Sequence, residues 1–349
     1  MKSKFIHGVN YPWSTDGQTV FYGLDFGTNV WGSHLGVTTR REAIARDFGE
    51  MAALGFVVAR WFVFCDGRAG IVYDDRSLPA GLDEQFFNDV DAALEIARGA
   101  NMQVVFVLFD HHWLFRGIHH AIADPITGDM VDARLPEGRV RELLSQEGHD
   151  ALFEHAVAPF VWRYGHDGIR SDLKDCIFAF EFMNEPDFVI DEWERDRSRR
   201  VRRAVPFAVF AVAVARFSKL VHAHTPALVT LAAARADNLW AWDDDALGID
   251  VLQLHAYPDS LSPGDVDPFV TPVSALDVGR DVILGEFRSA APLDESIEQV
   301  LAGGYAGAWP WSFSGTDSYG RLPIDALRRF GERHPHLVNP RFAAPKVDL

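Results

Sequence analysis

The stretch Cys176-Ile-Phe-Ala-Phe-Glu-Phe-Met183, followed by Asn184-Glu185-Pro186, decides the fold. Its apolar run has the length of a strand that is buried on both faces, as the strands of parallel sheets are. About a hundred residues later a second apolar run, Val282-Ile-Leu-Gly285, ends in Glu286. Parallel barrels place their functional groups at the C-terminal ends of their strands. Each run therefore predicts a buried strand that delivers one carboxylate to the same face of a barrel.

Apolar runs of strand length alternate with amphipathic helical stretches along the chain, which is the pattern of βα units. Eight strands with intervening helices predict an α/β fold, a single (β/α)8 TIM barrel over residues 1–349. An open doubly wound sheet is the alternative, but no glycine-rich phosphate loop follows an early strand. The predicted strands are Phe5–Asn10, Val57–Phe62, Gln103–Phe109, Ile177–Met183, Leu228–Ala232, Val251–His255, Val282–Glu286 and Gly307–Trp311.

Four of the connections predict clear helices, at 39–54, 83–98, 149–164 and about 201–223. Thr39 and Glu42 suit a capping box at the start of the first. Pro206 must lie in the first turns of the last helix or break it. The fifth and sixth helical segments are weak.

Two connections that follow strands one and three are unusually long, from Pro12 to Thr38 and from His111 to about Gly148. Long loops in compact domains are usually functional, and in a barrel the loops after strands lie on the catalytic face. Their aromatic rings are expected either to stack on sugars or simply to pack the loops down. These aromatic residues are Trp13, Tyr22, Trp31, Trp113 and Phe115.

The chain is strongly acidic, with 50 acidic against 33 basic residues and a formal net charge of −17. Nucleic acids and anionic membranes reward positive charge, so neither is expected as a partner. No apolar run is expected to span a membrane, and Met1-Lys-Ser-Lys-Phe5 leads into a strand without a signal-peptide core. We therefore expect a cytoplasmic protein, or a secreted one if a leader has been removed. The sequence predicts no oligomeric state.

Polar and aromatic residues gather at the predicted C-terminal ends of the strands. Buried strands do not carry such groups without a reason, because an unpaired buried charge is unfavourable. Together they predict a polar pocket with an aromatic floor at one rim of the barrel. In strand order they are Arg60, then Asp110, His111 and His112, then Asn184 and Glu185, then His255 and Tyr257, then Glu286, and finally Trp309 and Trp311.

Two carboxyl groups that face each other across a cleft can cut a glycosidic bond. Strands four and seven of a barrel lie on opposite sides, so Glu185 and Glu286 can approach to about 5 Å, the separation for direct nucleophilic attack. Arg60 and Tyr257 would keep Glu286 ionised through charge and hydrogen bonding, and repulsion would favour a proton on the other carboxyl. The alternative for either glutamate alone is a salt bridge at the rim.

These residues, taken in order, resemble glycoside hydrolase family 5, a family of barrel enzymes with catalytic glutamates on strands four and seven. The resemblance runs from Gly8-Val-Asn-Tyr11 to Trp311 and includes Asn184-Glu185-Pro186 and Gly285-Glu286-Phe287. It implies a carbohydrate substrate, a retaining mechanism that needs no cofactor, Glu185 as acid/base and Glu286 as nucleophile.

The resemblance also implies supporting roles around the two glutamates, and position in the sequence adds two tryptophans to the set. The residues are Arg60 and Tyr257 as supports of the nucleophile, His111 or His112 as the strand-three histidine, Asn184 as a hydrogen-bond partner of the sugar 2-hydroxyl, His255 as a residue that orders the site, Trp311 as the stacking platform, and Trp113 and Trp309 as further substrate contacts.

One residue departs from the family pattern, which often has Gly after Glu-Phe where this chain has Arg288. A cation is therefore expected near the nucleophile. Three short pieces resemble the mannanase-like branch and favour mannan over glucan. They are Asn10-Tyr11-Pro12-Trp13, Arg60-Trp61 and Trp113-Leu-Phe115.

The predicted function is hydrolysis of a β-linked oligo- or polysaccharide, of the β-mannan or β-glucan type, with retention of configuration. A carbohydrate-binding barrel without turnover is one alternative. A metal-dependent barrel lyase or isomerase that uses Glu185, Glu286 and the histidines as ligands is another. No metal site is predicted at His111, His112, His119 and His120, because adjacent side chains on a strand point apart.

Overall fold

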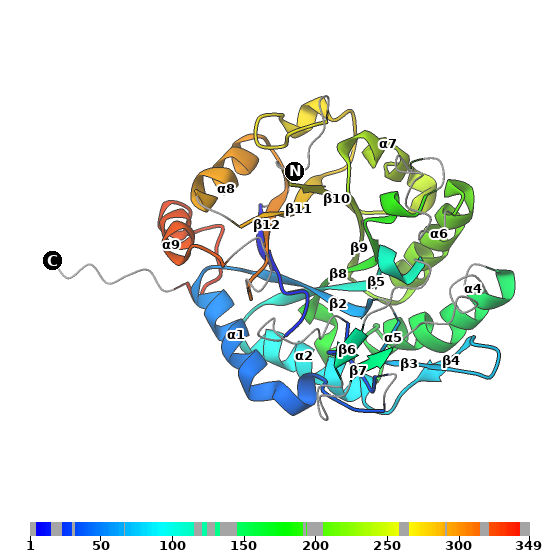
Figure 1. Cartoon of the computed structure of the whole chain (residues 1–349). Coiled ribbons are helices and arrows are strands. Elements are labelled where there is room, and N and C mark those ends of the chain that lie inside the picture. The colour runs from blue at the N-terminus through cyan, green and yellow to red at the C-terminus, as the bar shows by residue number, and fades with distance from the viewer. Residues whose placement is uncertain are drawn as a thin grey trace.

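The predicted (β/α)8 barrel is confirmed by a computed structural model of the chain, in which eight parallel strands close a ring in sequence order (Figure 1). The barrel strands are β1 (Ile6–Asn10), β2 (Val58–Cys65), β5 (Gln103–Asp110), β8 (Ile177–Asn184), β9 (Leu228–Ala233), β10 (Val251–Ala256), β11 (Val282–Arg288) and β12 (Gly307–Trp311). The structure describes residues 5–14, 23–29, 32–65, 67–114, 121–123, 130–132, 145–190, 193, 205–257, 265–289, 292–314 and 321–342.

Helices surround the ring of strands (Figure 1). The predicted helix 149–164 contains a π-helical turn, Phe153–Val157, between two α-helical parts. The long helix predicted at about 201–223 begins at Phe207, directly after Pro206, which is its N-cap residue. In the described part of the chain the helices are α1 (Arg41–Ala53), α2 (Phe86–Gly99), α4 (Gln146–Leu152), α5 (Ala158–Arg163), α6 (Phe207–His224), α7 (Leu239–Trp242), α8 (Leu293–Ala302) and α9 (Ile324–Arg333).

The predicted capping box at Thr39 is wrong. Helix α1 begins at Arg41 after a 3-10 turn, and its N-cap makes no side-chain hydrogen bond. The Thr39 hydroxyl instead donates to the Gly36 carbonyl at 2.8 Å. In the described part of the chain, the weak helical segment before β10 holds the one-turn helix α7 and two 3-10 turns, and the one before β11 holds a single 3-10 turn. The 3-10 turns are Val37–Arg40, His111–Leu114, Ser171–Cys176, Pro186–Phe188, Ala236–Asn238, Asp245–Leu247 and Val273–Ala275.

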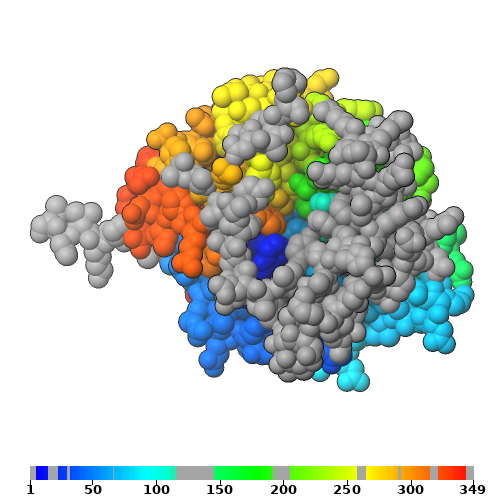
Figure 2. Space-filling view, viewed as in Figure 1, coloured from blue at the N-terminus to red at the C-terminus, as the bar shows by residue number. Residues whose placement is uncertain are grey.

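The loops that follow β2 and β5 each contain a two-stranded antiparallel ribbon in the described part of the chain. Strands β3 (Ile71–Tyr73) and β4 (Pro79–Leu82) form a ribbon that the sequence did not predict. Strands β6 (Ala121–Ala123) and β7 (Met130–Asp132) lie inside the predicted long connection after β5. In the space-filling view, dark-blue atoms of the N-terminal segment appear at the middle of the face, between orange atoms from late in the chain and green atoms from its middle (Figure 2).

The barrel interior is layered from apolar to ionic. Near the N-terminal ends of the strands, Trp309 is fully buried and its ring approaches Gly8 so closely that a Cβ there would lie 2.6 Å from it. The Trp309 indole nitrogen donates to the Ile6 carbonyl at 3.3 Å. This layer is completed by Val58, Val105, Ala179, Val251, Ile283 and Ala306. The next inward-facing residues along the strands are polar, Arg60, Glu181, Thr230 and Gln253, and all are buried.

Helix α6 has 18 residues and a mean hydropathy of 1.2, so it is long and apolar enough to cross a membrane. The expectation that no such run exists is therefore wrong by length and composition. One third of this stretch is buried inside the protein, and Phe210, Val214 and Phe217 are among its buried residues. Its buried face is that of an outer helix packed on a barrel.

One buried titratable group lies at the opposite end of β1 from the polar layer. His7 is fully buried, and its ring stacks on Phe56 at 4.6 Å between centroids and lies 5.0 Å from Phe330. Neither ring nitrogen has a hydrogen-bond partner among the described residues. Burial lowers the pKa of His7 from 6.5 to about 3, so the ring is neutral in the folded protein.

We predict that His7→Phe flattens the pH dependence of stability on the acid side. Below pH 6.5 the unfolded chain takes up a proton at His7 that the folded chain refuses until about pH 3, so stability falls as the pH falls through this window. Between pH 6.5 and 5 this linkage is worth about 2 kcal/mol. Urea unfolding at both pH values measures it, with the exposed His336→Phe as control. Equal slopes in wild type and His7→Phe would contradict a neutral buried ring.

Candidate active site

Strand β8 ends in a sharp turn that aims Glu185 into the barrel mouth. Glu185 has φ 48° and ψ 52°, a left-handed conformation that is unfavourable for a residue with a side chain. The turn is held by Asp187, whose carboxylate accepts from the Ala234 amide at 2.9 Å and from the Asn238 side chain. Burial raises the pKa of Asp187, and these donors oppose the rise. The strained backbone is thus fixed by neighbouring loop atoms.

Strand β11 is irregular where it presents Glu286. Its pairing register with β12 shifts between Leu284 and Phe287. Its pairing register with β10 also shifts, between Leu254 and His255 of β10. The Asn10 amide donates to the carbonyls of Gly285 and Trp309 at 2.8 and 3.0 Å. Asn10 therefore satisfies backbone groups that the irregular ladder leaves unpaired.

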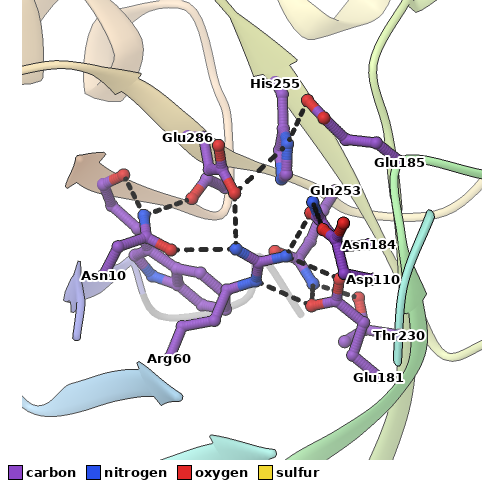
Figure 3. A network of polar contacts seen from close by, with 12 residues as sticks. Asn10, Arg60, Asp110, Glu181, Asn184, Glu185, Thr230, Gln253, His255 and Glu286 are labelled. Atoms are coloured by element: carbon purple, nitrogen blue, oxygen red, sulfur yellow. Dashed lines mark hydrogen bonds and ion pairs between the residues drawn. The ribbon is translucent and has the colours of Figure 1, made fainter. Parts of the chain in front are cut away.

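Arg60 is the centre of the polar layer (Figure 3). An arginine has five N–H donors, and each of those of Arg60 has an acceptor. Glu181 accepts two of them in a fork, at 2.8 Å from Nε and 2.7 Å from Nη2. The other acceptors are Asn10 Oδ1 at 2.9 Å, Glu286 Oε1 at 2.6 Å and Asn184 Oδ1 at 2.7 Å. The guanidinium, which is fully buried, is fixed in one orientation.

The two predicted catalytic carboxylates meet at one point. Single ligand atoms of Glu185, His255 and Glu286 all lie within 4.8 Å of one another. The imidazole Nδ1 of His255 is 3.0 Å from Glu185 Oε1 and 3.5 Å from Glu286 Oε1 (Figure 3). This carboxylate separation matches the short spacing of retaining glycosidases and is below the roughly 6.5–9.5 Å of inverting ones.

The environments of the two carboxyl groups differ. Burial raises the pKa of the Glu286 carboxyl, and Glu185 adds to this, while His255, Arg60 and the Tyr257 hydroxyl at 2.8 Å oppose it. Burial also lowers the pKa of Arg60, but its ion pairs with Glu181 and Glu286 outweigh this and raise it. Glu185 is more open, with 15% of its side chain exposed against 6% for Glu286.

His255 is neutral near pH 7, because burial lowers its pKa to about 4. Its one ring proton belongs on Nδ1, because that nitrogen faces two carboxylates. The neutral ring therefore donates a hydrogen bond to Glu185.

Asn184 is held by both ends of its amide. Its Oδ1 accepts from Arg60, and its Nδ2 donates to Asp110 Oδ2 at 2.9 Å. An amide nitrogen carries two hydrogens, so the second remains to be donated into the site. His111 follows Asp110, and its Nδ1 lies 3.6 Å from Asp110 and 3.8 Å from Glu185. Of the two candidate histidines, His111 is the one that the structure places beside Glu185, and the side chain of His112 lies outside the described residues.

The predicted aromatic residues separate into two groups. Trp311 is partly exposed, and its ring meets Trp13 edge-on at 5.9 Å and Phe62 at 6.3 Å, so it lies at the rim. Two assignments to the substrate site are wrong. Trp309 belongs to the apolar layer two residues earlier on β12, and Trp113 is 4% exposed because it packs edge-on against Phe109 at 3.9 Å. Tyr22, Trp31 and Phe115 lie outside the described residues.

The short pieces that favoured mannan are largely scaffold. Trp61 is fully buried and its indole donates to Asp25 at 2.7 Å, while Tyr11 donates to Asp47 at 2.6 Å. The two rings pack edge-on at 4.9 Å. Arg288 is exposed and pairs in register with Trp311 beside the site. The cation after Glu286 therefore lies at the rim, whereas Arg60 contacts the carboxylate.

Glu185, His255 and Glu286 are also the kind of group that could surround a metal ion. The donor set does not fit one well, because both Glu286 oxygens already accept strong hydrogen bonds from Arg60 and Tyr257. A guanidinium at 2.6 Å would repel a divalent cation bound to the same carboxylate.

Sequence reasoning missed the layer that supports the site. Three of its residues lie inside apolar strands and not at strand ends, where functional residues were expected. They are Glu181, Thr230 and Gln253. A charged residue in the middle of a buried strand was the available signal, because such a charge must be paired. The Gln253 amide donates to Glu181 at 2.8 Å and to Thr230 at 3.1 Å.

The chain was compared with known proteins. No protein-family model matches it, and no curated protein matches it by sequence. Solved structures do match. An endo-1,4-β-mannanase from Eisenia fetida has 19% identity and a TM-score of 0.68, covering 93% of this chain and 90% of its own. A β-mannanase from Mytilus edulis has 17% identity, a TM-score of 0.69 and the same coverage.

A third structure, a GH5_18 protein from Streptomyces cattleya in complex with Manβ1-4GlcNAc, has 14% identity and a TM-score of 0.60. The alignment covers 99% of this chain and 83% of that one. Similarity at this level of identity establishes that the chain shares the barrel fold of these proteins.

We predict that Tyr257→Phe raises the pKa of Glu286 further. The phenol donates to the ionised carboxylate, so its loss favours the protonated form. A hydrogen bond to a charged group is worth about 1.5 kcal/mol, or about one pH unit. A ¹³C-NMR titration of labelled glutamate carboxyls, assigned with Glu286→Gln, measures the midpoint. Tyr305→Phe removes a phenol that donates to the Thr271 carbonyl and serves as matched control. A midpoint that stays or falls in Tyr257→Phe would count against the contact.

Proposed function

We propose that this protein is a retaining β-glycosidase of the family 5 type, with Glu286 as nucleophile and Glu185 as acid/base. The observation that carries the proposal is the approach of the two carboxylates to within 4.8 Å, on strands from opposite halves of the barrel. This spacing suits direct attack of one carboxylate on a sugar that the other protonates. The whole constellation lies at the C-terminal ends of the strands, where barrel enzymes carry their chemistry.

In the first step Glu286 attacks the anomeric carbon while Glu185 gives its proton to the glycosidic oxygen. Arg60 and Tyr257 hold one oxygen each of Glu286, which fixes the carboxylate for attack. His255 donates to Glu185 Oε1, which leaves Oε2 to carry the proton. The bond between the sugar and its leaving group breaks as the glycosyl–Glu286 ester forms.

In the second step Glu185, now ionised, removes a proton from water, and the water oxygen displaces Glu286 from the anomeric carbon. Two inversions give net retention. The free N–H of Asn184 is placed to bind the hydroxyl next to the reacting centre, and Trp311 offers an aromatic surface for the ring. No residue in this sequence of steps needs a cofactor.

The proposed substrate is a β-mannoside. The solved structures with the same fold include β-mannanases and a protein bound to Manβ1-4GlcNAc, which supports this class. A neutral sugar also suits a chain with a net charge of −17.

We predict that Glu286→Ala loses activity on aryl β-mannosides by roughly 10⁴-fold or more, because the nucleophile is gone. Added azide should restore turnover and give the α-mannosyl azide, since a small anion then attacks once from the vacated side. Product analysis by NMR decides the configuration. Glu147→Ala, which removes a carboxylate that is 66% exposed, is the control and should match wild type. Near-normal turnover in Glu286→Ala would remove the assignment.

The three-residue cluster supports one competing function, a metal-dependent lyase or isomerase. We predict that dialysis against a chelator leaves glycosidase activity unchanged, because Arg60 and Tyr257 occupy Glu286. Loss of activity on chelation, with recovery on adding a divalent metal, would favour the competing function. A carbohydrate-binding protein would bind mannosides, measured by calorimetry, and show no turnover in any assay.

A further inference from the structure

The buried layer beneath the catalytic carboxylates holds one cation between two anions. Arg60 contacts Glu181 through Nε and Nη2 and contacts Glu286 through Nη1. The side chains of Arg60 and Glu181 are both fully buried, and that of Glu286 is 6% exposed. Water cannot screen charges in such a layer, so each charge acts strongly on the others.

Glu181 takes the larger share of Arg60. It accepts two of the five donors in the planar fork that arginine and carboxylates form, whereas Glu286 accepts one. A carboxylate paired in this way offsets most of the positive charge of the guanidinium. Glu286 therefore receives a short hydrogen bond from an ion pair, and only part of the field of a free cation.

The position of Glu181 is fixed from the other side as well. Its Oε2 also accepts from Gln253 Nε2 at 2.8 Å, and Gln253 donates in turn to Thr230. Gly285, directly before the nucleophile, makes room for this amide, because a Cβ there would lie 2.4 Å from Gln253 Oε1. Glu181 is thus also held by Gln253, which is not among the hydrogen-bond partners of Arg60 in the described structure.

We propose that Glu181 is a positioning residue that sets the basicity of the nucleophile, by deciding how much of the positive charge of Arg60 reaches Glu286. Its catalytic consequence rests on the proposed function, since a more basic Glu286 is a stronger nucleophile in the first step. Its effect on the protonation of Glu286 does not rest on that function.

Other charged groups around Glu286 do not duplicate this role. The described titratable and charged side chains near it are Arg60 on β2, Glu181 on β8, Glu185 just after β8, His255 on β10, Tyr257 just after β10 and Arg288 on β11. Glu181 is the member of this group that forks with Arg60. The raised pKa of Glu286, despite a guanidinium 2.6 Å away, is in keeping with a cation whose charge is already offset.

The test is a graded series at position 181, with the Glu286 carboxyl titrated by ¹³C NMR and the acid limb of kcat/KM recorded. Glu181→Gln removes the offsetting charge, so Arg60 acts fully on Glu286 and the midpoint should fall by about one pH unit or more. Glu181→Asp keeps the negative charge but moves it farther from Arg60, so the Glu286 midpoint should fall by less. Thr230→Val alters the same layer without touching Arg60 and should leave the midpoint in place.

A purely structural role predicts a different pattern. Rates would then drop evenly across the pH range, with the wild-type midpoint in both Glu181 variants, and this result would overturn the proposal. If Glu181→Gln gives no folded protein, the Glu181→Asp variant alone tests the proposal. A Glu286 titration midpoint in that variant equal to the wild-type value would then contradict it. If the wild type cleaves no glycoside yet the NMR midpoint moves as expected, the proposed function fails and the role of Glu181 stands.

Discussion

The buried guanidinium of Arg60 is the constraint on which the upper half of the barrel depends. Its five hydrogen bonds join β2 to β1 through Asn10, to β8 through Glu181 and Asn184, and to β11 through Glu286. Leaving one partner of a buried ion pair unpaired costs roughly 3–5 kcal/mol, so these bonds hold as a set. The interactions that close the ring at this level are the same ones that orient the carboxylates.

The layer below makes this arrangement possible. Trp309 and six aliphatic side chains fill the barrel beneath Arg60 and exclude water from it. In such surroundings an unmatched charge would be prohibitive, and a matched one is held firmly. The apolar floor and the ionic layer are therefore two parts of one device. Gly8 and Gly285 are required in these two layers, because the Trp309 indole ring and the Gln253 amide occupy the space that a Cβ at each glycine would need.

The sequence predicted the barrel and the meeting of Glu185 and Glu286 because both follow from local signals. A buried strand is largely apolar, and a polar residue at or near its C-terminal end faces the rim, as Asn184 at the end of β8 and Glu286 near the end of β11 do. Glu181 and Gln253 were missed because their hydrogen-bond partners lie on other strands. The sequence of one strand does not show which residues of other strands its side chains will contact. Trp113 and Trp309 were misassigned because an aromatic near a strand end packs inward or faces a ligand according to strand register and loop path.

The two glutamates differ in how they are held, and the difference matches the tasks proposed for them. Glu286 is held through its carboxylate, by the charged Arg60 and by Tyr257, which suits a group that must stay ionised until it attacks. Glu185 is held mainly through its backbone, in a left-handed turn that Asp187 secures, and its carboxyl meets a neutral imidazole. An acid/base must lose and regain a proton in each cycle, and a charged donor would oppose the regain. Strain in the main chain places Glu185 without fixing its charge.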